Sequence, residues 1–596
     1  MSHTALCTAL LALIWTQVGQ AKQDKHHHHA ARILINHTEA EFKRFWIPTD
    51  ISQMNSVWKL VKDPVSSDIY GGGLHGLFKF NTEQTGTDVE QVFNQSISLL
   101  TEQNHGSQLF ICKKTNKDEE DCNCCYLKSK SDCFKINTPV HVKDASLVIG
   151  KTLYFAMSGE STVATTLGLY KQNKDSFTWP QPIQITTRYV KILANRDSEA
   201  LDGKVYSFYI EKNSDKNPET PLWIPRVSQY CMADKGGTKN QLQYRWTSML
   251  TARLFCGNKI KKMTFTELLD VSVLETSSNT MIYALFKNEY GIRAVCVYTM
   301  SEITRVFTSA KFRNKEEPSI QTAGECVEDS RTLSSAVLKF MEKRPEMEEW
   351  IEPERGPLLV SNHWYKQLQV DMVNHHNILL LTLESGKIHK VLEEKDGHFI
   401  IAEYQPFENN TQIHSMLLDR STKKLYVSSS NQVVQINLQD CSRYGDKCTP
   451  CVLARDPYCS WTGILCLPAT NLNGDMRSGT VCKEGERVSA RMNGREALII
   501  PQDSKYYLKC SAPSQYASYT WIHDGAEKEC LSTDEDCLLL IESMSESDEG
   551  TYQCKASENG QIWTVSSYQL QKGGASHLRV APAVLMCLLL ICVMLL

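Results

Sequence analysis

The distribution of cysteines constrains the fold of this chain more than any other feature. The 596 residues contain 22 cysteines, with five between Cys112 and Cys133 and six between Cys441 and Cys482. This density is typical of proteins that fold in an oxidising compartment. Zinc is the alternative, because each cluster contains a C-x-x-C pair. Neither cluster supplies the second pair or the histidines that a tetrahedral zinc site needs, so we predict disulfides.

Length and charge narrow the possible classes of protein. A single hydrophobic core stops growing at roughly 250–300 residues, so we expect two or more domains. The chain is 42% hydrophobic, which excludes wholesale disorder. Its formal net charge of −4 provides no basic field for nucleic acid or an anionic membrane surface.

Both termini are typical of segments that are removed during secretion. Residues 5–18 are apolar and precede Gly19 and Ala21, which predicts a signal peptide over residues 1–21. At the other end, four small residues, Gly573 to Ser576, a short spacer and the apolar stretch 584–596 have the layout of a GPI-attachment signal.

We expect the GPI anchor on Gly573 or Gly574, with 575–596 as the removed propeptide. This places the protein on the extracellular face of the plasma membrane. The alternative is a membrane helix without a tail, although the apolar stretch is shorter than the ~20 residues needed to cross a bilayer. Removing both ends leaves 19 of the cysteines, an odd number.

The middle of the chain, residues 30–438, is dominated by short strand-like runs. Examples are 153–157 (LYFAM), 205–210 (VYSFYI) and 281–286 (MIYALF), and a hairpin is expected where 378–383 and 387–391 flank Ser385-Gly386. About 400 residues of short strands favour four-stranded blades around an axis, and seven blades fit. One helix is expected from Ser334 to Arg344, before Pro345.

Two smaller modules follow this region. Residues 440–483 form a cysteine-dense segment that is too short to fold without covalent links. Residues 484–571 carry Cys510, Trp521 and Cys554 at immunoglobulin spacing, with Tyr552 two residues before the second cysteine. This combination predicts an immunoglobulin-like β-sandwich.

Three segments of the chain resemble the semaphorin family. Residues 451–461 (CVLARDPYCSW) resemble the PSI module that follows a sema propeller, and 425–436 (LYVSSSNQVVQI) resemble its last strands. The family's central segment is similar to residues 226–256, which include RVSQYC, DKGG and WTSMLTARL. The resemblance covers about residues 40–570, and the order sema, PSI, one Ig-like domain and GPI signal is similar to class-7 semaphorins.

This resemblance implies an all-β protein: a seven-bladed sema propeller, a PSI module and an Ig-like sandwich. It further implies a homodimer that binds a plexin, of class C, through the sema domain and signals in cell or axon guidance and immune-cell regulation. The alternative is a sema-domain receptor-like or adhesion protein held by a short membrane helix.

Catalytic and metal motifs are not evident. The sequence lacks G-x-S-x-G, H-E-x-x-H and P-loop patterns, and adjacent strand residues such as His375 and His376 point to opposite faces. The acidic run 118–121 lacks the spacing of an EF-hand. We therefore expect no enzyme activity and no cofactor.

The class-7 resemblance also makes integrins candidate partners of this chain. Semaphorins of that class typically carry Arg-Gly-Asp after the cysteine of the central segment, but this chain has Met232-Ala233-Asp234 there. Without the arginine, whose guanidinium makes paired hydrogen bonds, we expect integrin recognition through this loop to fail. The alternative role for Asp234 is to support the turn before Gly236-Gly237.

The resemblance implies nine disulfides, and the sequence contains three N-glycosylation sequons. The excess cysteine is Cys124, although spacing alone does not decide whether Cys124 or Cys125 pairs with Cys133. We expect glycans on Asn36, Asn94 and Asn409. The expected disulfides are Cys112–Cys122, Cys125–Cys133, Cys231–Cys326, Cys256–Cys296, Cys441–Cys459, Cys448–Cys482, Cys451–Cys466, Cys510–Cys554 and Cys530–Cys537.

Overall fold

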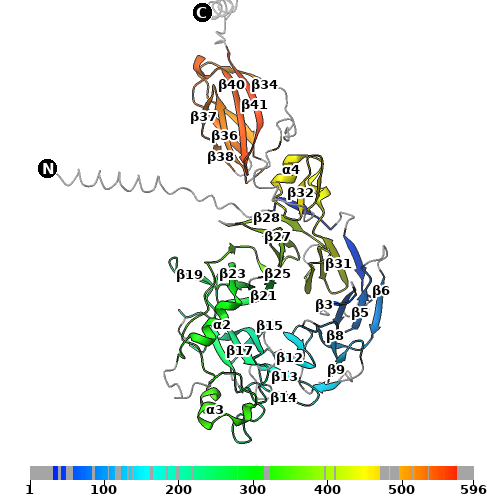
Figure 1. The fold of residues 1–596 in the computed structure, drawn as a ribbon. Helices are drawn as coiled ribbons and strands as arrows, with labels where there is room; N and C mark the ends of the chain where they lie inside the picture. The colour runs from blue at the N-terminus through cyan, green and yellow to red at the C-terminus, as the bar shows by residue number, and fades with distance from the viewer. Residues whose placement is uncertain are drawn as a thin grey trace, which may run out of the picture. The chain divides into compact units, whose positions relative to one another are not determined.

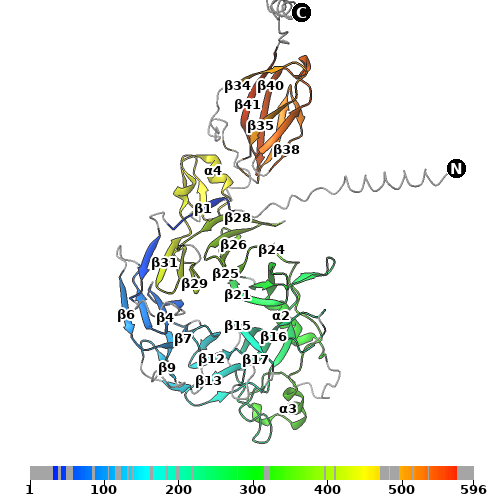
Figure 2. The same cartoon turned by 180° about the vertical axis from the view of Figure 1, so that it is seen from behind.

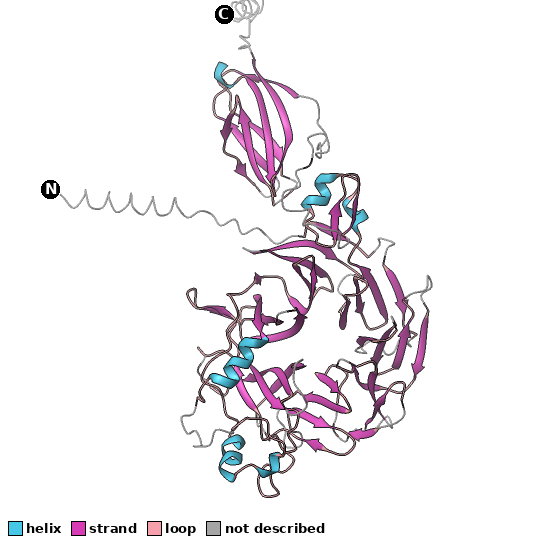
Figure 3. Cartoon of the chain, viewed as in Figure 1, coloured by secondary structure: helices cyan, strands magenta, loops and turns pink. Residues whose placement is uncertain are grey.

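The computed structural model describes residues 31–573 apart from several gaps. The longest gaps are 49–57, 83–87, 115–121, 161–165, 196–201, 314–322, 470–481 and 483–495. The chain divides into two compact units, one of residues 29–440 and one that contains residues 441–573 (Figures 1 and 2). Strands dominate both units, and helices are few (Figure 3).

The described residues of the first unit form seven four-stranded blades around a central axis (Figure 1). The prediction of an all-β fold with a seven-bladed propeller is confirmed. The first four blades are β3 (Lys59–Lys62), β4 (Ile69–Gly73), β5 (Gly76–Phe80) and β6 (Val89–Phe93); β7 (Ile97–Glu102), β8 (Leu109–Lys114), β9 (Cys122–Tyr126) and β10 (Phe134–Ile136); β11 (Ser146–Ile149), β12 (Thr152–Met157), β13 (Gly168–Gln172) and β14 (Phe177–Thr178); and β15 (Thr187–Ala194), β16 (Lys204–Lys212), β17 (Trp223–Cys231) and β18 (Leu250–Arg253).

The last three blades include strands that are distant in sequence. They are β21 (Glu267–Glu275), β22 (Thr280–Lys287), β23 (Arg293–Thr299) and β24 (Leu359–Ser361); β25 (Tyr365–Val373), β26 (His376–Leu383), β27 (Ile388–Glu394) and β28 (Gly397–Tyr404); and β2 (Lys43–Trp46), β31 (Gln432–Asn437), β30 (Lys424–Ser428) and β29 (Ser415–Asp419). A short hairpin of β19 (Gly257–Asn258) and β20 (Met263–Thr264) precedes β21.

The N-terminal residues close the ring. Strand β2 pairs antiparallel with β31, with Phe45 opposite Val433, so the last blade contains both ends of the propeller sequence. Strand β1 (Ile33–Ile35) pairs in parallel with β28 of the preceding blade. Between blades the core is apolar: Phe45, Trp58 and Phe78 are at most 1% exposed and pack together. Burial of such side chains is the main force that stabilises the propeller.

A long insertion separates β23 from β24. It contains α2 (Met300–Ser309), η2 (Ser330–Thr332) and α3 (Ser335–Glu342). Thr299 Oγ1 caps α2 by accepting a hydrogen bond from Glu302 N at 3.2 Å. The helix predicted from Ser334 to Arg344 corresponds to α3, whereas α2 was not predicted because its sequence is flanked by strand-like runs.

The second unit begins with the small disulfide-linked module. Its described elements are η3 (Cys441–Tyr444), α4 (Cys448–Leu453), β32 (Cys459–Trp461) and β33 (Cys466–Pro468). The two sheets of the Ig-like sandwich follow. The larger sheet has β34 (Glu496–Pro501), β41 (Gln561–Gly573), β40 (Gly550–Glu558), β36 (Ser518–His523) and β37 (Ala526–Lys528); the smaller has β35 (Tyr506–Ser511), β39 (Asp536–Ile541) and β38 (Leu531–Ser532); and η5 (Glu546–Asp548) precedes β40.

The sandwich shows the local features expected from its sequence. The disulfide Cys510–Cys554 joins the two sheets, and Trp521 is fully buried beside it. The hydroxyl of Tyr552 donates to the carbonyl of Asp548 at 3.2 Å. This is the tyrosine-corner hydrogen bond.

Nine disulfides link the described residues, and one differs from the expected set. Cys112 bonds to Cys124, not to Cys122. The register of the β8–β9 pair explains this, because Cys112 lies directly opposite Cys124 while Cys122 lies opposite Lys114. Cys124 is therefore not the excess cysteine; the buried Cys122 lies outside these nine bonds. The other eight are Cys125–Cys133, Cys231–Cys326, Cys256–Cys296, Cys441–Cys459, Cys448–Cys482, Cys451–Cys466, Cys510–Cys554 and Cys530–Cys537.

Candidate protein-interaction surface

A buried carboxylate holds the loop between β17 and β18. Asp234 is 2% exposed, and its oxygens accept hydrogen bonds from the backbone N–H groups of Gly236, Thr247 and Ser248 at 2.8–2.9 Å. The hydroxyls of Thr247 and Ser248 donate to the same carboxylate. Lys171 Nζ donates to the carbonyl of Asp234 at 2.8 Å. These bonds satisfy a buried charge and fix both ends of the loop.

The middle of this loop has an unusual backbone conformation. Gly236 has φ +84°, and a Cβ there would lie 2.7 Å from the backbone nitrogen of Tyr244, so the close approach requires glycine. Tyr244 itself has φ 58°, in the left-handed region. Its carbonyl accepts a hydrogen bond from Trp179 N at 2.7 Å. The loop is therefore fastened to the end of β14 in a conformation that costs energy and persists only with such support.

Three exposed aromatic side chains meet at this point, and we call them the aromatic surface: Phe177, Trp179 and Tyr244. The ring of Phe177 lies 5.1 Å from that of Trp179 and 5.1 Å from that of Tyr244, measured between centroids. Their exposed fractions are 38%, 44% and 50%, respectively. Contiguous exposed aromatics on a rigid backbone are typical of protein-recognition surfaces.

Cationic residues lie along the same loop. Lys235 and Lys239 are exposed, and Arg245 is half-buried with its guanidinium donating to Pro180 O at 2.7 Å. The carboxylate of Asp234, by contrast, is buried beneath the loop. The loop that carries Tyr244 is therefore rich in positive charge, while Asp175 is exposed two residues before Phe177. Such charges steer encounter and select the partner when the partner's charges are complementary.

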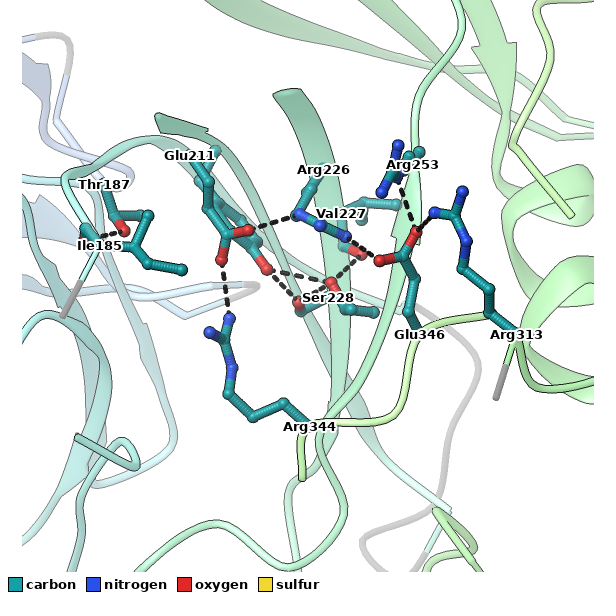
Figure 4. A network of polar contacts seen from close by, with 12 residues as sticks. Ile185, Thr187, Glu211, Arg226, Val227, Ser228, Arg253, Arg313, Arg344 and Glu346 are labelled. Atoms are coloured by element: carbon teal, nitrogen blue, oxygen red, sulfur yellow. Dashed lines mark hydrogen bonds and ion pairs between the residues drawn. The ribbon is translucent and has the colours of Figure 1, made fainter. Parts of the chain in front are cut away.

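A second group of charged residues attaches the insertion to the fourth blade (Figure 4). Four arginines alternate with two glutamates, and Arg226 at the centre is only 8% exposed. The ion pairs are Arg344–Glu211 at 2.8 Å, Arg226–Glu211 at 2.6 Å, Arg226–Glu346 at 3.0 Å, Arg253–Glu346 at 2.7 Å and Arg313–Glu346 at 2.5 Å.

The ion pairs have a structural role. Burial disfavours ionisation of Glu346, but the guanidinium groups of Arg226 and Arg253 outweigh it and hold the pKa of Glu346 below its ordinary value. Glu346 also lies beside Thr251, and Ile351 beside Leu254, in parallel bridges. The segment 346–351 thus extends the outer edge of the fourth blade.

The integrin-related residues lie within the carboxylate-supported loop. Asp234 supports the turn before Gly236 through the hydrogen bonds described above, which is the alternative that the sequence left open. At 2% exposure its carboxylate lies beneath the surface. Met232 and Ala233 are partly buried.

The groups considered for catalysis or metal binding divide between described and undescribed residues, and the acidic run 118–121 lies outside the described ones. Within the described ranges, no three His, Cys, Asp or Glu side chains are placed to hold a metal ion. His375 lies in the turn before β26, with φ 63°. A Tyr365–His389–Glu403 chain has hydrogen bonds of 2.7 and 2.8 Å, and Tyr365 and His389 are at most 1% exposed.

The expected modification sites divide between described and undescribed residues. Asn36 and Asn94 are exposed, just after β1 and β6. Gly573 is the last residue of β41. Asn409, Gly574 and the ranges 1–21 and 575–596 lie outside the described residues. No helix in the described part of the chain has both the length and the apolar character needed to cross a membrane.

The sequence analysis did not identify the aromatic surface. The sequence pattern that could have revealed this surface is the alternation Phe177-x-Trp179, because alternate residues of a strand lie on the same face. Tyr244 gave no signal of its own, because its position depends on the left-handed backbone at that residue.

Comparison with known proteins finds two domain families. A sema domain model matches residues 268–420, and an immunoglobulin domain model matches residues 492–571. The chain is 31% identical over 408 residues to human Semaphorin-7A, a match that covers 64% of this chain and 61% of that protein. Mouse Semaphorin-4D is 29% identical over 415 residues, covering 62% of this chain and 48% of that protein. The matches therefore span less than two thirds of these relatives.

Solved structures share the fold. Drosophila Semaphorin 2a superposes with a TM-score of 0.66 at 18% identity, covering 89% of this chain and 98% of that one. A structure described as Drosophila Plexin A in complex with Semaphorin 1b gives a TM-score of 0.57 at 19% identity, covering 72% of this chain and 94% of that one.

Proposed function

Since the chain belongs to the semaphorin family, we propose that it is a cell-surface ligand that binds a plexin through its propeller. The plexin is of class C, by resemblance to class-7 semaphorins. The ligand acts as a homodimer in cell or axon guidance and immune-cell regulation. The disulfide-rich extracellular architecture fits this location, and the GPI anchor on Gly573 or Gly574 retains it on the membrane.

The aromatic surface is the observation that carries this proposal. Phe177, Trp179 and Tyr244 are exposed, and Phe177 stacks on Trp179 and lies tilted against Tyr244. Hydrogen bonds to the backbone on both sides of Tyr244 hold the loop in place. The structural neighbour from Drosophila contains a plexin bound to a semaphorin, which supports the class of partner. We place the plexin contact at this surface, with the cationic residues of the same loop facing acidic groups of the receptor.

The mechanism requires binding and no chemical step. Two propellers in a homodimer hold two receptors at a fixed separation, and the receiving cell detects the altered arrangement of its plexins. A rigid ligand suits this task because little conformational entropy is lost on binding. Bivalency increases the effective concentration of the second contact without new interactions.

Binding of the full chain to plexin-expressing cells tests the proposal. In one format, the chain is added to cells that carry a class-C plexin and to mock-transfected cells. In the reciprocal format, the soluble plexin ectodomain is added to cells that display the chain. We expect Tyr244→Ala to weaken binding by roughly 30-fold, the effect of removing an interface hot spot of about 2 kcal/mol.

The matched control is Tyr290→Ala, which removes a tyrosine that is 88% exposed in another loop. We expect this variant to bind like the wild type. Equal plexin binding by the Tyr244→Ala and Tyr290→Ala variants would show that the contact lies elsewhere on the propeller. Absence of wild-type binding to plexin-bearing cells would reject the ligand function and favour the receptor-like or adhesion alternative.

A further inference from the structure

Two lysine side chains meet in the central channel of the propeller. Strands β3, β7, β11, β15, β21, β25 and β29 are the edge strands of their blades and neighbour one another around the axis, so their inward side chains line this channel. In Figures 1 and 2 β15, β21 and β25 border the centre of the ring. Lys59 begins β3 of the first blade, and Lys191 lies in β15 of the fourth. Both side chains are half-buried, so water and dissolved gas reach them.

The amine of Lys59 reaches across the channel without an ionic partner. Its Nζ donates to Ser146 Oγ of the third blade at 3.4 Å, which is a long hydrogen bond to a neutral group. Lys62 of the same strand, by contrast, pairs with Asp419 at 2.7 Å. Within the described ranges, no carboxylate lies at ion-pair distance from Lys59 or Lys191.

Two carboxylates act on Lys59 from a greater distance. Asp144 accepts a hydrogen bond from His141 N at 2.8 Å, and Glu102 is exposed at the end of β7. Their charges favour the ammonium form of Lys59. Burial and the ammonium group of Lys191 disfavour that form more strongly, and the pKa of Lys59 falls to about 8.

A carboxylate also acts on Lys191. Asp270 of β21 interacts electrostatically with this lysine, but its oxygens accept hydrogen bonds from the backbone N–H groups of Val271 and Leu368, each at 2.8 Å. Burial raises the pKa of Asp270 to about 6. The ammonium group of Lys191 therefore remains available to a new anion in the channel.

A neutral lysine amine beside a second cation is a nucleophile. With a pKa of about 8, about a fifth of Lys59 is neutral at pH 7.4, roughly 200 times the fraction of an ordinary lysine. The lone pair of such an amine attacks the carbon of carbon dioxide and forms a C–N bond. One C=O π bond breaks, its electron pair moves to oxygen, and one N–H proton leaves to water. The product is a carbamate, and the reaction needs no oxidant or reductant.

We propose that Lys59 binds carbon dioxide as a carbamate, which forms an ion pair with Lys191 in the central channel. The reaction replaces two groups that repel each other by two groups of opposite charge. The hydroxyl of Ser146 is placed to donate to the carbamate. Because Lys59 and Lys191 belong to blades that are not neighbours in the ring, the new ion pair links distant parts of the propeller. The proposal goes beyond receptor binding, and its test does not use a plexin.

Lys171 is the internal control for this chemistry. Burial lowers its pKa to about 8 as well. Its Nζ, however, donates to the carbonyls of Met232 and Asp234 at 2.6 and 2.8 Å, and the side chain is 8% exposed. A lysine held by two carbonyl acceptors is not free to attack, so we expect no carbamate on Lys171.

Chemical trapping in the full-length protein tests the proposal. The protein is equilibrated at pH 7.4 with ¹³C-labelled carbon dioxide or in carbon-dioxide-free buffer, and triethyloxonium then converts any carbamate to a stable ethyl ester. Peptide mass spectrometry locates the labelled ethoxycarbonyl group. We expect at least tenfold more label on Lys59 than on Lys171, and none in the carbon-dioxide-free sample.

Variants of the second lysine separate the pair from a single reactive amine. Lys191→Met is expected to lower the label on Lys59 by at least fivefold, because it removes both the repulsion that favours the neutral amine and the counter-ion of the carbamate. The matched control is Lys174→Met, since Lys174 is exposed in the turn before β14. We expect this variant to label Lys59 like the wild type.

Thermal unfolding provides a second readout. At fixed pH and ionic strength, carbon dioxide should raise the melting temperature of the wild type through the new ion pair. It should not raise that of Lys59→Arg, which keeps the positive charge but does not lose its proton. Absence of label on Lys59 in the folded wild type would overturn the proposal. Equal label on Lys59 and Lys171, or undiminished label in folded Lys191→Met, would do the same; if that variant does not fold, the comparison within the wild type decides.

Discussion

Replacement of Asp234 by asparagine tests the support of the aromatic surface. The carboxylate accepts hydrogen bonds from three backbone N–H groups, those of Gly236, Thr247 and Ser248. An amide keeps one acceptor oxygen and turns an NH₂ group toward the remaining donors. At least one backbone N–H is then left buried without an acceptor. The change keeps the volume of the side chain, so any effect arises from hydrogen bonding and charge.

The expected cost follows from these bonds. A hydrogen bond to a charged group contributes about 1.5–3 kcal/mol, and an unsatisfied buried donor adds a penalty of similar size. We expect local opening of the 232–248 loop to become easier by about 3 kcal/mol, which corresponds to more than 100-fold faster amide exchange. Hydrogen–deuterium exchange at the Thr247 and Ser248 amides measures this directly.

Plexin binding should weaken in the same variant, because Tyr244 loses its support. Asp175→Asn is the matched control, since Asp175 is exposed in the turn before β14. Its exchange should resemble that of the wild type. Unchanged protection of Thr247 and Ser248 in the Asp234→Asn variant would refute the reasoning.

Four further outcomes are expected. Phosphatidylinositol-specific phospholipase should release the protein from cells; retention of residues 575–596 in the mature chain would instead favour a membrane helix. Asn36→Gln and Asn94→Gln should each remove one glycosidase-sensitive mass shift, and no shift would show the site unused. Integrin-bearing cells should not adhere through buried Asp234, and adhesion blocked by a soluble Arg-Gly-Asp peptide would contradict this. Burial lowers the pKa of His389 in the folded chain, although the hydrogen bond to Glu403 opposes this shift. Below about pH 6.5 the unfolded chain therefore binds a proton on His389 that the folded chain does not bind. The free energy of unfolding should then fall as the pH falls below this value. Melting at pH 7.5 and 5.5 should show a smaller acid loss in His389→Gln than in the wild type, and an equal loss would exclude His389 as the cause.

The sequence predicts those features of the fold that depend on local patterns. Short apolar runs such as 205–210 indicated strands, and the spacing of Cys510, Trp521 and Cys554 indicated the Ig-like sandwich. Helix α3 was visible because Ser334 caps it and Pro345 follows it. In each case the signal lies in residue types at fixed positions within one segment of the chain, and it does not require knowledge of strand register or of contacts between blades.

Features that depend on register or on distant partners were not predictable from one sequence. The Cys112–Cys124 bond follows from which residues face each other in β8 and β9; a shift of two residues would favour Cys122. The aromatic surface joins Phe177 and Tyr244, which are far apart in sequence and meet only when the third and fourth blades are in place.

The closure of the ring by β2 has a consequence for biosynthesis. Strand β2 is made near the start of translation, but its partner β31 ends at Asn437, about 390 residues later. At roughly 5–20 residues per second, synthesis of the intervening chain takes about 20–80 s. During that time the last blade lacks its other strands, and an edge strand exposes unpaired backbone groups. Strand β2 therefore stays without its partner until β31 has been made, and any chain that stops before β31 leaves an open ring with two unpaired ends.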